Sequence, residues 1–211
     1  MYDAILFDLD GTLIDTERLA VEAGRAAFAA LGHSDAEDLL HRLIGVDMPS
    51  AQRLLRASYP ALDLAALDAH WGAHFDAAMA VSVPLKSGAF DLVHDLAARH
   101  PLALVTSSGR EHAMDKLERS GLMPAFQLIV TREDVTAPKP APDPYLLAAR
   151  HFKADPARCL VFEDSEPGTE AAHRAGMRVV HVPDVVPPSG RFAHHIAQDL
   201  HAGARWAGLI A

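Results

Sequence analysis

The segment AILFDLDGTL, residues 4–13, decides the fold. Four apolar residues followed directly by two aspartates and a glycine predict a fully buried strand that ends in a tight turn. Asp8 and Asp10 are two positions apart, so their carboxylates project from the same side of an extended chain. At about 4 Å and an effective dielectric constant near 20, two such charges repel by on the order of 4 kcal/mol. The pattern therefore predicts a cation or a proton between them, and an acidic surface turn is the alternative.

Length and composition restrict the class of protein. A chain of 211 residues can form one large domain, or one domain with a modest insertion. Its 19 basic and 28 acidic residues give a net charge of −9, which disfavours a nucleic-acid partner. The single cysteine, Cys159, permits no internal disulfide and fits a reducing cytoplasm, although it also reads as a small buried apolar residue. We expect a cytoplasmic protein.

Neither a secretory signal nor a membrane segment is expected. The first three residues, MYD, provide no basic region ahead of an apolar run that is only a few residues long. No stretch approaches 18 uninterrupted apolar residues, so we expect no membrane partner. The oligomeric state is left open, because the sequence contains no signal for it.

The pattern of apolar residues changes twice along the chain. Residues 15–86 show helical spacing and no convincing strand, which predicts a helical lobe inserted after the first strand. From residue 87 onward, short apolar runs alternate with helical segments, which predicts a parallel sheet with helices on both faces. The expected strands after the first are residues 102–106, 126–130, 158–162 and 178–182. Residues 192–209 are expected to form a terminal helix, with His194 and His195 on its surface.

Polar residues follow three of the predicted strands. The first strand is followed by the two aspartates, the second ends in Thr106 and Ser107, and the fourth is followed by Glu163 and Asp164. Lys139 lies in the loop between the third and fourth strands, flanked by prolines that stiffen the loop, with a cis bond as one way to aim the ammonium. Since the carboxyl ends of parallel strands meet at one edge of a sheet, these residues are expected to converge. Together they favour binding of a phosphoryl group beside a divalent cation.

Each residue of this set has a chemical task in such a site. Asp8 is expected to act as nucleophile and metal ligand, attacking phosphorus to give an aspartyl phosphate. Mg²⁺ and Lys139 would offset the negative charges that meet in this step. Asp10 would give a proton to the departing alcohol and later take one from water. Thr106 and Ser107 would hold phosphate oxygens through hydroxyl and backbone N–H groups.

Four segments in order resemble the four motifs of the haloacid dehalogenase superfamily. They are DLDGT at 8–12, LVTSS at 104–108, KP at 139–140 and FEDS at 162–165. Further similarity at 139–143 and 168–177 resembles the β-phosphoglucomutase-like branch of phosphatases and mutases. The resemblance covers nearly the whole chain up to Val182 and implies a Rossmann-like catalytic core, residues 1–14 and 87–211, with a helical cap, residues 15–86, that closes over the site.

The resemblance also implies a set of metal ligands. Mg²⁺ would be bound by the carboxylate of Asp8, the backbone carbonyl of Asp10 and the carboxylate of Asp164, with Glu163 as a further or outer ligand. Dehalogenation is disfavoured, because dehalogenases of the superfamily lack the second aspartate of the first motif. The expected function is that of a Mg²⁺-dependent phosphatase acting on a small organic phosphomonoester, such as a sugar phosphate.

Two alternatives remain beside the phosphatase. Sugar-phosphate mutases of the branch carry a histidine where this chain has Ala20, and a basic residue in the loop where this chain has GVDMP at 45–49. A mutase needs a second, cationic phosphate site, so both differences favour hydrolysis. The alternative from another class is a non-catalytic phosphate-binding regulatory module, which would have no need of a nucleophile paired with a proton carrier. A zinc site at His70 and His74, four residues apart on a predicted helix, is less favoured than a solvated helix face.

Overall fold

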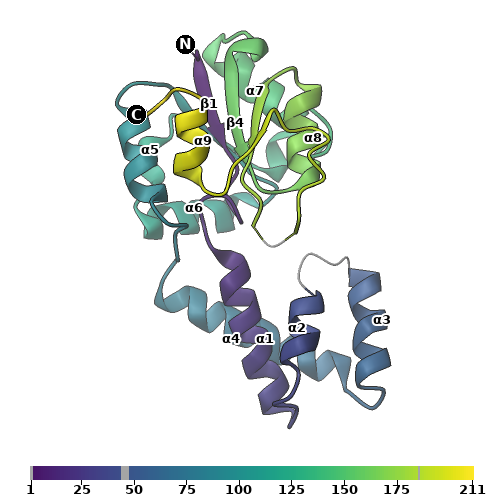
Figure 1. Cartoon of the computed structure of the whole chain (residues 1–211). Coiled ribbons are helices and arrows are strands. Elements are labelled where there is room, and N and C mark those ends of the chain that lie inside the picture. Colours follow the sequence, from purple (N-terminus) through teal and green to yellow (C-terminus); the bar gives the residue numbers. More distant parts are fainter. Residues whose placement is uncertain (1, 44–47, 185) are drawn as a thin grey trace. The chain divides into compact units, whose positions relative to one another are not determined.

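The computed structural model describes residues 2–43, 48–184 and 186–211 (Figure 1). The chain forms two compact units: Met1–Asp15 with Val83–Ala211, and Thr16–Ser82. Asp15 and residues 83–86, which were expected in the helical insertion, belong to the first unit. The reason is local, since backbone hydrogen bonds run from Asp15 to Pro84 and from Lys86 to Leu13.

A parallel sheet forms the centre of the first unit. Among the described residues its strands lie in the order β3-β2-β1-β4-β5-β6, and each neighbouring pair is parallel. The strands are β1 (Ala4–Phe7), β2 (Leu102–Val105), β3 (Leu128–Val130), β4 (Cys159–Glu163), β5 (Arg178–His181) and β6 (His195–Ile196). The predicted α/β fold with a parallel sheet is therefore confirmed, and the strand of residues 4–7 lies inside the sheet.

Helices cover both faces of this sheet, as Figure 1 shows. Successive residues of β1 point to opposite faces, so Ile5 and Phe7 belong to one apolar cluster and Ala4 and Leu6 to the other. The first cluster is completed by α5 (Ala89–Ala97), α6 (Arg110–Ser120) and α9 (Leu200–Trp206), and the second by α7 (Asp143–Phe152) and α8 (Glu166–Arg174). Short 3-10 turns cover Met123–Ala125, Arg132–Asp134 and Pro156–Arg158. Packing on both faces explains why the strands read as continuous apolar runs.

The second unit consists of helices among its described residues. They are α1 (Thr16–Ala30), α2 (Glu37–Leu43), α3 (Met48–Ser58) and α4 (Leu64–Val81). Phe28, Leu40 and Leu67 lie in its apolar core, and Asp63 caps α4 by accepting hydrogen bonds from two backbone N–H groups. No described helix of either unit has both the length and the apolar character that a bilayer crossing needs. Residues 45–47, on which part of the comparison with mutases rests, lie outside the described residues.

The expected terminal helix over residues 192–209 is wrong. The segment instead adds the short strand β6 to the sheet, because His194 and Ala197 donate backbone hydrogen bonds to carbonyls on β5. Helix α9 begins only after Asp199, whose side chain accepts from the N–H of Ala202 at 2.6 Å. His195 consequently lies on a strand, and its ring stacks on Trp206 rather than pointing from a helix surface.

Candidate active site

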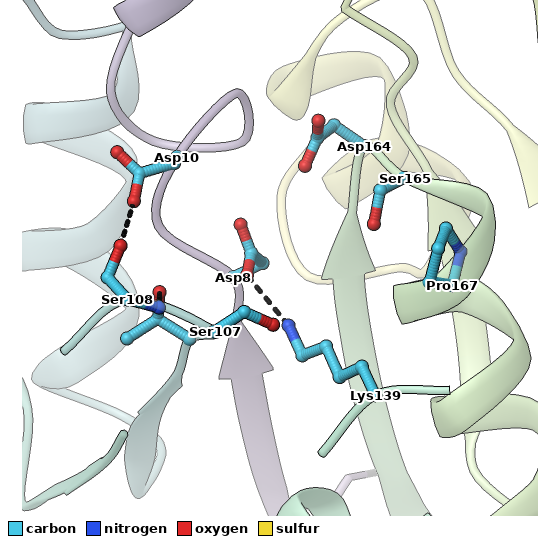
Figure 2. Close-up of a pocket in the computed structure, with 9 residues that line it drawn as sticks. Asp8, Asp10, Ser107, Ser108, Lys139, Asp164, Ser165 and Pro167 are labelled. Atoms are coloured by element: carbon cyan, nitrogen blue, oxygen red, sulfur yellow. Dashed lines mark hydrogen bonds and ion pairs between the residues drawn. The ribbon is translucent and has the colours of Figure 1, made fainter. Parts of the chain in front are cut away.

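A pocket lies where the carboxyl ends of β1, β2 and β4 meet. Its volume is about 460 Å³, and all of its lining residues belong to the sheet-containing unit. The lining residues are Asp8, Asp10, Thr106, Ser107, Ser108, Lys139, Asp164, Ser165 and Pro167. Figure 2 shows the labelled residues converging from strand ends, from the loop that carries Lys139 and from the start of α8. The structure thus brings together residues that are up to 159 positions apart, between Asp8 and Pro167. Glu163 lies beside this set but does not line the pocket.

Lys139 is bound from three sides. Its Nζ lies 2.7 Å from Asp8 Oδ1, 2.6 Å from Glu163 Oε1 and 2.9 Å from the carbonyl oxygen of Val105. These acceptors match the three protons of an ammonium group. The side chain is 5% exposed, and the bond from Lys139 to Pro140 is cis. The ammonium is therefore fixed beside Asp8, in the position where it can offset negative charge in the pocket.

Glu163 is the second carboxylate that binds Lys139, and it does not line the pocket. The glutamate is fully buried and accepts from Tyr145 Oη at 3.0 Å on one oxygen, and from the N–H and hydroxyl of Ser165 on the other. Burial alone would raise the pKa of Glu163, but the charge and hydrogen bond of Lys139 and the bonds from Ser165 outweigh it, so the pKa is lowered. Burial opposes the charge of Lys139, yet Asp8 and Glu163 hold the lysine pKa well above its ordinary value. Both shifts favour the charged forms of Lys139 and Glu163, which therefore form an ion pair.

Asp8 and Asp164 carry the excess negative charge of the site. Burial raises the pKa of Asp8 well above its ordinary value against the effect of Lys139, and Glu163 and Asp164 raise it further. Burial, followed by the charge of Glu163, raises the pKa of Asp164 to about 7, although Thr12 donates a hydrogen bond to it at 2.9 Å. Such shifts are expected where carboxylates gather without enough positive charge. The negative charge of Asp8 and Asp164 therefore favours the binding of an additional cation in the pocket.

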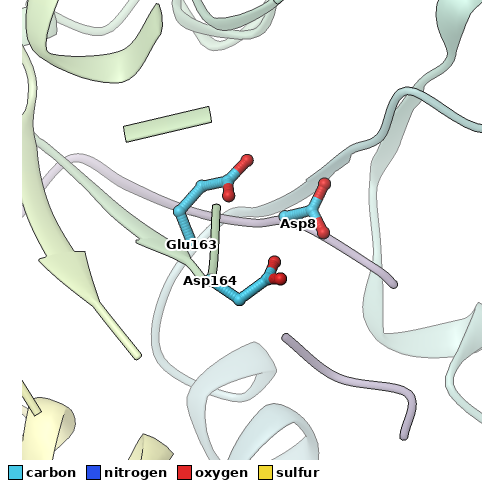
Figure 3. Close-up of side chains that lie close together, drawn as sticks. All are labelled: Asp8, Glu163 and Asp164. Atoms are coloured by element: carbon cyan, nitrogen blue, oxygen red, sulfur yellow. The ribbon is translucent and has the colours of Figure 1, made fainter. Parts of the chain in front are cut away.

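The carboxylate oxygens have the chemistry of a magnesium site. One oxygen from each of Asp8, Glu163 and Asp164 lies within 4.8 Å of the others, as Figure 3 shows for the three side chains. Hard carboxylate oxygens are the protein ligands that Mg²⁺ prefers. The backbone leaves room for them, since a Cβ at Gly11 would lie 2.3 Å from Asp164 Oδ2, and its φ of +89° favours glycine. The donor set thus fits the predicted ion.

Asp10 has a different set of partners. Its Oδ2 accepts from Ser108 Oγ at 2.6 Å, and its Oδ1 lies 2.5 Å from Lys116 Nζ. In Figure 2 the Asp10 carboxylate is directed toward Ser108, whereas that of Asp8 is directed toward Lys139. The two aspartates of the first motif are therefore held by cations from different elements of the fold.

The segment that follows β2 lines part of the pocket. Thr106 is buried, and its hydroxyl accepts from the N–H of Ser108 at 3.0 Å, which shapes the turn that leads into α6. Ser107 lies on this turn and lines the pocket. Backbone N–H groups at the start of a helix suit an anion. This placement suits the predicted use of both residues in holding phosphate oxygens.

Sequence reasoning missed several residues of the site. Lys116, Thr12 and Tyr145 each contact a predicted carboxylate. Thr12 lies in the first motif but was given no role, and Lys116 and Tyr145 lie outside the segments that guided the prediction. A usable signal exists for Lys116, because it lies on α6 three residues after Ala113 and next to Leu117, both of which are buried. A charged residue among the buried positions of a helix needs a partner of opposite charge.

Comparisons with known proteins identify the family that this chain matches. A family model described as haloacid dehalogenase-like hydrolase matches residues 5–182. The chain is 35% identical over 181 residues to validoxylamine A 7'-phosphate phosphatase of Streptomyces hygroscopicus subsp. limoneus, covering 84% of each chain. It is 34% identical over 185 residues to fructose-1-phosphate phosphatase of Escherichia coli (strain K12), covering 86% of this chain and 96% of that one. A HAD family hydrolase of Deinococcus radiodurans R1, solved with bound phosphate and sodium, superposes with a TM-score of 0.84 at 28% identity, covering 100% of this chain and 98% of that one.

Proposed function

This chain belongs to the family of haloacid dehalogenase-like hydrolases, and on that premise we propose that it is a Mg²⁺-dependent phosphatase acting on a small organic phosphomonoester, such as a sugar phosphate. The observation that carries the proposal is the placement of Asp8 in the pocket, with Oδ1 2.7 Å from Lys139 and its carboxylate beside that of Asp164. Similar proteins named as phosphatases of validoxylamine A 7'-phosphate and of fructose 1-phosphate support the substrate class.

In the first step an oxygen of Asp8 attacks the phosphorus of the ester. A bond forms between this oxygen and phosphorus while the bond from phosphorus to the ester oxygen breaks. The electron pair goes to the departing alkoxide, which takes a proton from the carboxyl group of Asp10. Lys139 offsets the negative charge of Asp8 and the phosphoryl oxygens, and Thr106 and Ser107 hold those oxygens.

In the second step water attacks the phosphorus of the aspartyl phosphate. The water proton passes to Asp10, the bond between phosphorus and Asp8 breaks, and inorganic phosphate is released. Asp8 then regains its carboxylate. The two steps together consume one water molecule and leave the enzyme unchanged, so no further reactant is required.

Asp8, Asp164 and the backbone carbonyl of Asp10 would hold Mg²⁺, with Glu163 outside this set because both of its oxygens are bound by Lys139, Tyr145 and Ser165. The ion would supply positive charge at the phosphoryl oxygens. The role of the helical segment, expected at residues 15–86, as a cap remains a prediction of the family resemblance. The cytoplasmic location remains a prediction from the single cysteine.

The test is release of inorganic phosphate from a panel of sugar phosphates, glycerol phosphate and 4-nitrophenyl phosphate, with Mg²⁺ and with a chelator. We expect release only with the metal, and none from Asp8→Asn, whose shape and fold should be unchanged. Absence of release from every ester by folded, metal-loaded protein would contradict the proposal and favour a phosphate-binding module. Interconversion of hexose 1- and 6-phosphates without net release would instead favour the mutase.

A further inference from the structure

The contacts of Asp10 come from one neighbouring segment of the fold. Ser108 precedes α6 and Lys116 lies within it, and each donor binds a different oxygen of the same carboxylate, at 2.6 and 2.5 Å. All three residues belong to the sheet-containing unit. The direction of the Asp10 side chain, visible in Figure 2, is therefore set by that unit itself.

Lys116 is unusual for a helical lysine because only 15% of its side chain is exposed. It shares the inward-facing stripe of α6 with Ala113 and Leu117, and its ammonium reaches a carboxylate 106 residues away in the chain. Holding a lysine in this way costs side-chain entropy and hydration. A lysine on the exposed side of α6 would keep its ammonium in water. The ion pair with Asp10 therefore accounts for the burial of Lys116.

We propose that Lys116 is a positioning residue for Asp10: with Ser108 it holds the proton-carrying carboxyl group at the wall of the pocket. The inference rests on the proposed function, in which the same carboxyl group gives a proton to the alkoxide and later takes one from water. Both transfers require Asp10 to stay within hydrogen-bond reach of the reacting oxygen. Lys116 does not line the pocket, so it acts through Asp10 and not on the substrate.

This role has a signature that a general structural role lacks. An alkyl alkoxide needs a proton as it leaves, whereas 4-nitrophenolate is a stable anion and leaves without one. The ratio kcat/KM reports the path from free enzyme and ester to the transition state of the step that releases the alcohol. Misplacing Asp10 should therefore lower kcat/KM for an alkyl phosphate and spare kcat/KM for 4-nitrophenyl phosphate.

The experiment compares wild type, Lys116→Met and Lys116→Arg with Mg²⁺, using glycerol phosphate and 4-nitrophenyl phosphate. Since general acid catalysis contributes roughly 10²–10⁴-fold, we expect Lys116→Met to lose about 10–10²-fold on glycerol phosphate and less than about 3-fold on the aryl ester. Lys116→Arg should recover most of the loss, because it restores a cationic donor. Arg119→Met, which removes a positive charge from the exposed side of the same helix beside Asp115, should change neither substrate selectively.

Three results are decisive. Equal losses on both esters, or no loss on either, would overturn the inference while leaving the proposed function intact. Lack of phosphate release by wild type from these two esters and from the sugar phosphates of the panel above would overturn the proposed function and the inference with it. If Lys116→Met does not fold, Ser108→Ala makes the same comparison, because it removes the other hydrogen bond to Asp10, and a selective loss on glycerol phosphate is again the expected result.

Discussion

Asp8 and Asp10 are separated by one residue, yet the protein surrounds them differently. The side chain of Asp8 is 10% exposed and faces Lys139, which is 5% exposed and shared with the fully buried Glu163. The side chain of Asp10 is 28% exposed and faces Lys116 and Ser108. The predicted nucleophile therefore depends on a closed set of buried charges, whereas the predicted proton carrier remains open to water. Each arrangement suits its task, because the proton carrier must exchange protons with alcohol and water.

The largest expected effect on stability comes from removing the shared cation. Lys139→Met leaves Asp8 and Glu163 buried without their partner, and breaking such a buried pair costs about 3–5 kcal/mol of unfolding free energy. Lys116→Met breaks a more exposed pair and should cost about 1 kcal/mol or less. Urea unfolding of both variants measures the difference. Equal losses would refute the distinction between a buried and an open half of the site.

A second variant tests how tightly the Glu163 side of the site is packed. A Cβ at Gly168 on α8 would lie 1.7 Å from Glu163 Oε1, so Gly168→Ala must displace the buried carboxylate. We expect a loss of about 1–3 kcal/mol in thermal or urea unfolding, as for other overpacked sites. Gly72→Ala on α4 is the matched control, since nothing lies near its Cβ, and it should be neutral or stabilising. Similar behaviour of the two variants would contradict the packing described for Glu163.

A third variant removes only one hydroxyl group from the buried network. Tyr145→Phe removes the hydrogen bond of 3.0 Å to Glu163 but leaves the bonds from Lys139 and Ser165 in place. A lost bond to a buried charged group should cost about 1–3 kcal/mol, with phosphate release still measurable. Tyr59→Phe removes a hydroxyl that binds the exposed Asp35, and its unfolding free energy should change less. A larger loss for Tyr59→Phe would show that the buried network does not depend on Tyr145.

Much of the fold could be predicted from the sequence, because a strand buried on both faces is a continuous apolar run. Residues 4–7, 102–105 and 159–162 have this pattern, and the polar residues after each of them identify the pocket edge. Strand β6 could not be predicted in this way, since its two residues pair only through the backbone with β5 and His195 carries no apolar signal. A two-residue strand has no periodicity to detect.

The partners of the site residues were harder to predict than the residues themselves. The sequence places Asp8, Asp10, Lys139 and Asp164 at strand ends or in the loop beside them, but side-chain pairing depends on packing between distant segments. Nothing local connects Lys116 with Asp10, or Tyr145 with Glu163. The sequence suggested Glu163 as a further or outer metal ligand, whereas its hydrogen bonds in the structure are with Lys139, Tyr145 and Ser165. The catalytic roles of all these residues remain predictions.

The central claim is that Asp8 becomes phosphorylated during turnover. The most direct measurement is mass spectrometry of the wild-type protein after rapid acid quenching during hydrolysis of a phosphate ester with Mg²⁺. We predict the added mass of one phosphoryl group on the peptide that contains Asp8, and its absence in Asp8→Asn. Steady phosphate release with Asp8 unmodified at every quench time, together with undiminished release by Asp8→Asn, would contradict the account.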